Sequence, residues 1–211
     1  RQSRFRVDAE FVRDSALSIS GLLVQKIGGK SVKPYQPAGY WQHLNFPARK
    51  WQSGKGDELY RRSLYTFVCR SFPHPAMVAF DAPSREECSA ERPRSNIPQQ
   101  ALVLLNDPVF VEAAKALAER LLKEGKATDE QKLDKIFDLA LTRKPSKQES
   151  NVLLELLAAQ RKRYKEDGKA ALELLSTGAK PADPSIKTSE LAAWTSISRA
   201  MLNLYETTAR F

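Results

Sequence analysis

The chain has 211 residues, of which 42% are apolar and 28% charged, and this composition excludes collagen-like and disordered proteins. No run of 18 apolar residues is present, so the sequence predicts no membrane-spanning helix. Because the chain starts with Arg1 and carries no signal peptide, we expect a processed protein or a piece of a longer one. The length suits a single domain over 1–211.

Two cysteines and two histidines limit the cofactor chemistry. Cys69 and Cys88 exclude a disulfide-dense scaffold and a cysteine-rich zinc site. No C-x-x-C-H is present, so this chain holds no covalently attached haem. His43 and His74 are far apart, so no metal site is expected. Whether the two cysteines are bridged stays open, with unbonded, buried thiols as the favoured alternative.

Positive charge is concentrated in the first half of the chain. The formal net charge of +9 divides into +7 for residues 1–106 (16 Lys and Arg, 9 Asp and Glu) and +2 for residues 107–211 (18 and 16). The first half also holds 12 of the 18 aromatic residues. Such a surface suits nucleic acid or an acidic polysaccharide, whereas the alternative is an arginine-rich network that ties loops together. The basic residues are scattered and no nucleic-acid motif accompanies them, so we favour the network and expect no nucleic-acid partner.

The first half alternates short elements with long loops. Apolar spacing predicts a helix over about 10–27, with Asp8 as the N-cap and Gly28 as the stop. A second helix is predicted over about 58–70, although its Tyr, Thr, Phe and Val content makes a strand the competing assignment. Residues 30–56 and 71–95 are rich in proline and predict loops. The first loop is expected to be pinned by its large aromatics, which are Tyr35, Tyr40, Trp41, Phe46 and Trp51.

The second half reads as helical almost throughout. Pro98 begins one helix, and Asp107 with Pro108 begins the next, which runs to about Lys123. Capping boxes at 128–131 and 146–149 predict helices over about 129–142 and 147–166, and two more are expected over about 169–176 and 189–208. The fold class is therefore mainly α: a helical half packed on a loop-rich half that is rich in arginine and aromatics, with few or no short strands. The last helix should bury an apolar stripe, which comprises Leu191, Trp194, Ile197, Met201 and Leu204.

No catalytic motif is present, and the sequence nominates no catalytic residue. Gly29-Lys30-Ser31 resembles the end of a phosphate-binding loop, but Val24 stands where the first glycine is needed and a helix precedes the motif. Neither G-x-S-x-G nor G-x-G-x-x-G occurs. We therefore lean against enzymatic activity for this chain alone.

The densest polar segment runs from position 61 to position 106. Its arginines, amides and carboxylates alternate with proline turns, which leave backbone groups in need of side-chain partners. We expect eight of these side chains to lie close together, either as a structural clamp or as a pocket for an anionic or sugar ligand. They are Arg61, Arg62, Arg70, Asp81, Arg85, Asn96, Gln99 and Asn106.

The order of motifs along the chain resembles one protein family. The carrying segments are 8–15, 20–23, 28–32, 34–37, 59–67, 80–88, 96–108 and 202–206, among them Phe-Asp-Ala-Pro-Ser-Arg-Glu-Glu-Cys at 80–88. Together they resemble the domain of unknown function 1553, a family of large exported proteins of planctomycetes. Lys30 and the Val68-Cys69 pair depart from the family pattern, as does Ser-Asn-Ile-Pro-Gln-Gln-Ala-Leu at 95–102. Cys88 matches the pattern and Cys69 does not, which argues against a bridge between them.

The resemblance implies a context rather than an activity. It implies the C-terminal part of an exported, periplasmic or cell-surface protein, with partner domains upstream in the same polypeptide. A c-type cytochrome domain is often among them, so haem c would belong upstream and no cofactor is expected in this chain. We favour a non-catalytic binding or interaction module, with an anionic polysaccharide as a candidate partner. The alternatives are a catalytic or carbohydrate-binding domain in polysaccharide processing and a purely structural C-terminal scaffold.

Overall fold

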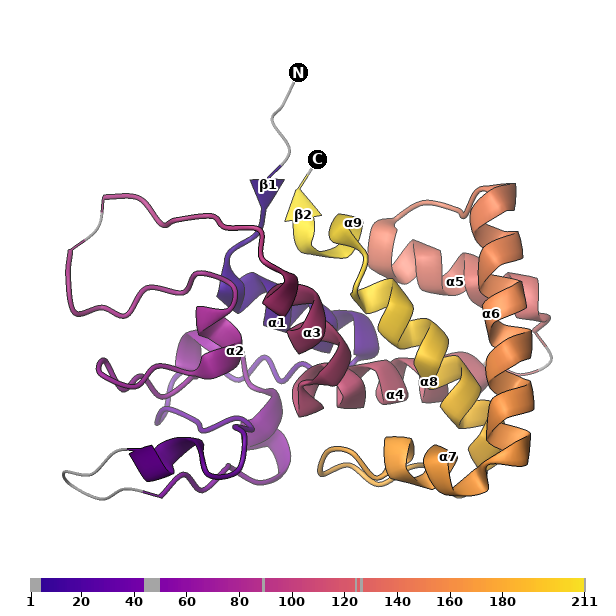
Figure 1. Cartoon of the computed structure of the whole chain (residues 1–211), viewed down its shortest axis with the longest axis horizontal. Helices are drawn as coiled ribbons and strands as arrows, with labels where there is room; N and C mark the ends of the chain where they lie inside the picture. The colour runs from indigo at the N-terminus through magenta and orange to yellow at the C-terminus, as the bar shows by residue number, and fades with distance from the viewer. Residues whose placement is uncertain (1–4, 44–49, 89, 124, 126, 211) are drawn as a thin grey trace.

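The computed structural model describes residues 5–43, 50–88, 90–123, 125 and 127–210. Helices dominate and gather in the second half of the chain, beside a loop-rich first half, so the predicted mainly α fold is confirmed (Figure 1). The helices are α1 (Ala9–Ser20), α2 (Pro75–Val78), α3 (Pro98–Asn106), α4 (Pro108–Lys123), α5 (Asp129–Leu141), α6 (Lys147–Glu166), α7 (Gly168–Leu175), α8 (Thr188–Leu202) and α9 (Tyr205–Thr208). Strands β1 (Phe5–Arg6) and β2 (Ala209–Arg210) pair antiparallel and bring the two ends of the described chain together (Figure 1).

Helix α8 lies at the centre of the helical half, where it packs against α4, α6 and α7 (Figure 1). Its predicted stripe is confirmed for Leu191, Trp194, Ile197 and Met201, all of which are buried. The prediction for Leu204 is wrong: this side chain is 37% exposed because it lies beyond the end of α8. A second cluster joins the two halves, because side chains of α1, α3 and α4 pack there together with Phe80.

Local capping accounts for the best-predicted helices. The Thr128 hydroxyl accepts a hydrogen bond from the backbone of Gln131, whose side-chain oxygen accepts one from the Thr128 backbone. Ser146 and Glu149 form the same reciprocal pair at the start of α6. Each box satisfies backbone N–H groups that the first helical turn leaves unpaired, so both helices begin where the sequence predicts.

The first helix is shorter than predicted, since α1 ends at Ser20 rather than near residue 27. Gly21 adopts the left-handed conformation with φ of 80°, and its N–H donates to the carbonyls of Leu17 and Ser18. Glycine takes this conformation without steric cost, so it ends the helix before Gly28 is reached. The chain then runs extended, and Val24 forms a bridge with Arg61.

The predicted helix over 58–70 is wrong. Two 3₁₀ helices, η2 (Gly56–Tyr60) and η3 (Ser63–Tyr65), replace it, and Thr66 forms a parallel bridge with Val32. Leu64 and Val68 are 66% and 41% exposed, so the segment does not bury one apolar helical face. The strand-favouring residues of this segment pair with the extended chain that follows α1, and this long-range pairing overrides helical periodicity.

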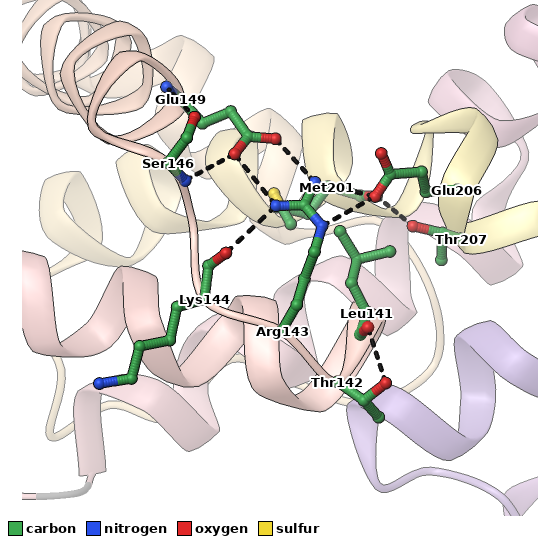
Figure 2. Close-up of polar contacts among 9 residues, drawn as sticks. All are labelled: Leu141, Thr142, Arg143, Lys144, Ser146, Glu149, Met201, Glu206 and Thr207. Carbon is green, nitrogen blue, oxygen red and sulfur yellow. Dashed lines mark hydrogen bonds and ion pairs between the residues drawn. The ribbon is translucent and has the colours of Figure 1, made fainter.

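The predicted last helix divides into α8 and α9, because Leu204 has extended backbone angles. Arg143, just after α5, stabilises the break (Figure 2). Figure 2 shows its guanidinium between two carboxylates, with Nη2 2.7 Å from Glu149 and 2.8 Å from Glu206. Arg143 thereby ties α9 to the start of α6.

Helix α4 carries buried charged side chains that hold the loop between α7 and α8. The Lys115 ammonium, which is almost fully buried, donates to the carbonyls of Leu175, Thr177 and Lys180 at 2.9, 2.8 and 2.7 Å. The Glu112 carboxylate is fully buried and accepts from the backbone N–H of Lys180 at 2.7 Å. It also accepts from two tyrosine hydroxyls of the first half, those of Tyr35 and Tyr60. These contacts connect the two halves through one helix.

Aromatic rings pin the 30–56 loop, as predicted. Trp41 stacks on Trp51 with ring centroids 5.2 Å apart, and Phe72 packs edge-on against Trp41. Phe46 lies outside the described residues. Cys69 is half-buried, Cys88 is exposed, and both thiols are free.

Candidate functional site

A cavity of about 670 Å³ opens beside the β1–β2 ribbon, at the N-terminal end of α3, and we call it the arginine pocket. It collects residues from both ends of the described chain and from the polar segment singled out in the sequence. Its walls combine cations, amides and hydroxyls with apolar surface. The lining residues are Phe5, Arg6, Phe80, Arg94, Ser95, Asn96, Ile97, Pro98, Gln100, Ala101, Leu104, Asn203, Tyr205 and Thr208.

An ion pair between Arg6 and Asp81 stands behind one wall of the pocket. Asp81 has φ of 62°, a left-handed conformation that its short side chain tolerates, and it also accepts from the backbone N–H and the hydroxyl of Ser95 at 2.8 and 2.7 Å. Arg6 further donates to the Ser95 carbonyl at 2.8 Å. Burial acts to raise the pKa of Asp81, but the hydrogen bonds from Arg6 and Ser95 outweigh it and lower that pKa. The wall is therefore a fixed, charge-compensated scaffold.

Arg94 is the exposed cation of the pocket. Its guanidinium lies over the ring of Phe5, 4.7 Å from the centroid, and no carboxylate lies within ion-pair distance of it among the described residues. None of the described lining residues is acidic. Gln100, which is buried, donates to the Ser95 carbonyl at 3.2 Å and holds the start of α3 against this wall. The pocket thus presents one uncompensated positive charge beside an aromatic ring.

The eight residues expected to form one cluster are divided among several places. Asp81 and Asn96 belong to the arginine pocket or its wall. Arg61 is buried elsewhere: it donates to the carbonyls of residues 26, 28 and 30 and stacks on Tyr65 at 3.9 Å. Arg62 lies 4.0 Å from Asp14, and Arg70 is exposed.

The remaining three are dispersed as well. Arg85 lines a small cavity of about 50 Å³ with Thr66 and His74, while Asn106 donates to the carbonyl of Leu102 in its own helix. Gln99 is exposed in the first turn of α3. No described hydrogen bond or ion pair joins any two of the eight side chains, so they do not share one polar network.

Sequence reasoning missed the partners that complete the pocket. Arg6 lies 75 positions before Asp81, and Asn203 lies at the other end of the chain. No local spacing signals that these residues meet, because they come from distant parts of the chain. The sequence placed Asp81 among eight polar residues expected to lie together, but Arg6, which pairs with it, was not one of them.

His74, in the loop-rich half, and Asp107, at the start of α4, have shifted pKa values. Burial lowers the pKa of His74 to about 4, and its Nε2 lies 2.8 Å from the carbonyl of Tyr35. Burial raises the pKa of Asp107 to about 6, although its carboxylate accepts from the Val109 N–H as the N-cap of α4. Within the described part of the chain, no three His, Cys, Asp or Glu side chains gather as a metal site. None of the described helices is long and apolar enough to cross a membrane.

Comparison with known proteins places the chain in a family. The model for the family described as protein of unknown function (DUF1553) matches residues 1–157. The chain belongs to the DUF1553 family. The resemblance seen in the sequence motifs is thereby confirmed, and the matched part of this DUF1553 chain includes Arg6, Asp81, Arg94 and Asn96 but not Asn203. No curated protein and no solved structure matches the chain.

Proposed function

We propose that this DUF1553 chain is a non-catalytic binding module whose arginine pocket takes an acidic saccharide polymer. The observation that carries the proposal is the lining of the pocket, which includes two arginines and, among the described residues, no acidic side chain. Arg6 is compensated by Asp81, and Arg94 is the cation left to meet an anion. A planar guanidinium held over an aromatic ring still directs its N–H groups in its own plane, which suits carboxylate and sulfate oxygens.

The charge of the whole chain favours the same class of ligand. The net charge of +9, with +7 in the half that supplies Arg6 and Arg94, attracts polyanions over distances of about 8–10 Å at ordinary ionic strength. The volume of about 670 Å³ lies within the range of small-molecule sites, roughly 300–1,000 Å³. The pocket therefore suits a few units of a polymer rather than a protein surface.

The proposal extends to the setting that the family resemblance implies. The module would serve an exported, periplasmic or cell-surface protein, with upstream domains of the same polypeptide as its partners. Where a c-type cytochrome domain stands upstream, haem c belongs to that domain, and this module would hold its neighbours on a polyanionic matrix.

Binding of defined polymers tests the proposal. We expect polygalacturonate and dextran sulfate to bind in isothermal titration calorimetry, neutral dextran not to bind, and the affinity for both anions to fall as salt rises. Arg94→Ala should weaken binding about tenfold or more, the effect of losing hydrogen bonds to a charged group. Arg70→Ala is the matched control, since Arg70 is exposed and lies outside the pocket.

Two results would contradict the proposal. Equal weakening by Arg94→Ala and Arg70→Ala would mean that polyanions bind by diffuse charge and not in the arginine pocket. If no polyanion binds, the purely structural scaffold is the better account, because the ion pair of Arg6 with Asp81 would then serve only to stabilise the fold.

A further inference from the structure

The arginine pocket is lined by amide and apolar side chains as well as by arginines, so its lining can distinguish among anionic ligands. Resting on the proposed function, we infer that the pocket receives one hydroxyl-bearing carboxylate unit, a sugar acid, with Arg94 on the carboxylate and amide side chains on the hydroxyls. Sulfate and phosphate esters are then weaker ligands of the same site.

The balance of charges argues for a single carboxylate. Asp81 neutralises Arg6 through their ion pair, so the pocket offers one uncompensated guanidinium, that of Arg94. A carboxylate brings one negative charge and two oxygens that match the guanidinium fork. A phosphate monoester brings nearly two charges, and the second would meet no uncompensated cation among the described lining residues, because Arg6 is already paired with Asp81.

The amides argue for hydroxyl groups. Asn96 lies just before α3, Gln100 lies within α3 and Asn203 follows α8, and each amide carries both a donor and an acceptor. A sugar hydroxyl also donates and accepts, whereas an ionised sulfate only accepts. Nothing among the described residues donates to Asn203 Oδ1, but this atom is shielded from solvent and a ligand does not reach it. Asn96 is exposed, so it is the amide that can offer a sugar hydroxyl both a donor and an acceptor.

The apolar part of the lining points the same way. Phe5 stands beneath Arg94, and Ile97, Pro98 and Leu104 continue the apolar surface. The C–H face of a pyranose ring can cover this surface and remove it from water. Inorganic anions have no such face, so their binding would leave it hydrated.

Titration with small probes separates the ligand classes. We expect galacturonate to bind, by chemical-shift titration of the labelled protein, about tenfold more tightly than galactose, acetate or inorganic sulfate, since each lacks one recognised group. Arg94→Gln should reduce galacturonate to the affinity of galactose. Asn96→Ala, in an exposed loop, should weaken galacturonate without changing acetate, and Arg70→Gln should change neither.

Each alternative outcome has its own meaning. Sulfate or acetate binding as tightly as galacturonate overturns the sugar-acid inference but leaves the proposed polyanion function standing. If galactose binds as tightly as galacturonate, both the sugar-acid inference and the proposed polyanion function are overturned, because the pocket then does not recognise the carboxylate charge.

Discussion

Replacement of Lys115 by methionine removes the ammonium that holds the loop between α7 and α8 while keeping the length of the side chain. Three hydrogen bonds from an ammonium contribute about 1.5–3 kcal/mol each, or roughly 5–9 kcal/mol together. Removing the charge also recovers the desolvation penalty of a buried ion, about several kcal/mol. We therefore expect Lys115→Met to lower the free energy of unfolding by about 3–4 kcal/mol, near the range for breaking a buried charged contact.

Urea unfolding followed by tryptophan fluorescence and circular dichroism measures this difference, provided that the two probes give coincident transitions. Lys180→Met is the control: the Lys180 side chain is 46% exposed and its ammonium lies 3.8 Å from Glu119, so its loss should change stability by about 0–1 kcal/mol. Equal stabilities of the two variants would refute the reasoning, because the three carbonyls would then be satisfied without Lys115.

Three further predictions concern the fold. Trp194→Ala should lower the free energy of unfolding by about 3–5 kcal/mol, because the ring is fully buried, and a parental melting temperature would contradict the central role of α8. Thr142 has φ of 53°, so Thr142→Gly should stabilise the chain by about 0.5–1 kcal/mol in urea unfolding, and a loss of stability would show that no strain is relieved. The pKa of His74 is about 4 in the folded protein and ordinarily 6.5. His74 therefore makes the folded protein less stable as pH falls from 6.5 to 4, because the unfolded state binds the proton more tightly. The pKa of Asp107 is about 6 in the folded protein and ordinarily 3.8. Asp107 therefore makes the folded protein more stable as pH falls from 6 to 4, because the folded state binds the proton more tightly than the unfolded state. On acidification from pH 6 to pH 4, the stability of His74→Gln in urea unfolding should therefore rise relative to that of the parent, and the stability of Asp107→Asn should fall relative to it. If the profiles of stability against pH run parallel to that of the parent, both assignments are contradicted.

Features that depend on neighbours three or four residues away could be predicted from the sequence. The boxes begun by Thr128 and Ser146 placed the starts of α5 and α6, and the spacing of Trp194 and Ile197 placed the buried face of α8. The two capping boxes lie within one turn, so the local pattern contains the whole interaction, and the apolar spacing of α8 shows which face is buried although its packing partners lie on other helices.

Features that depend on distant partners could not be predicted from the sequence. Glu112 and Lys115 look like ordinary surface charges of an amphipathic helix, and they are buried because their partners come from the first half of the chain and from the loop before α8. Asp81 was named only as one of eight clustered residues, and its partner Arg6 lies 75 positions away in β1. Arg61 satisfied backbone carbonyls of the segment after α1 instead of joining Asp81.

The β1–β2 ribbon has a mechanical consequence. Phe5 pairs with Arg210 in antiparallel register, so tension applied through the two ends of the described chain pulls this pair directly apart. The ladder then opens one pair at a time, as a zipper does, instead of sharing the force among all its hydrogen bonds as sliding strands would. Phe5, Arg6 and Thr208 line the arginine pocket, so stretching disassembles the pocket before it strains α8 and the helices around it. On the proposed function, load applied through the two ends would therefore release a bound ligand while α8 and the helices around it stay packed.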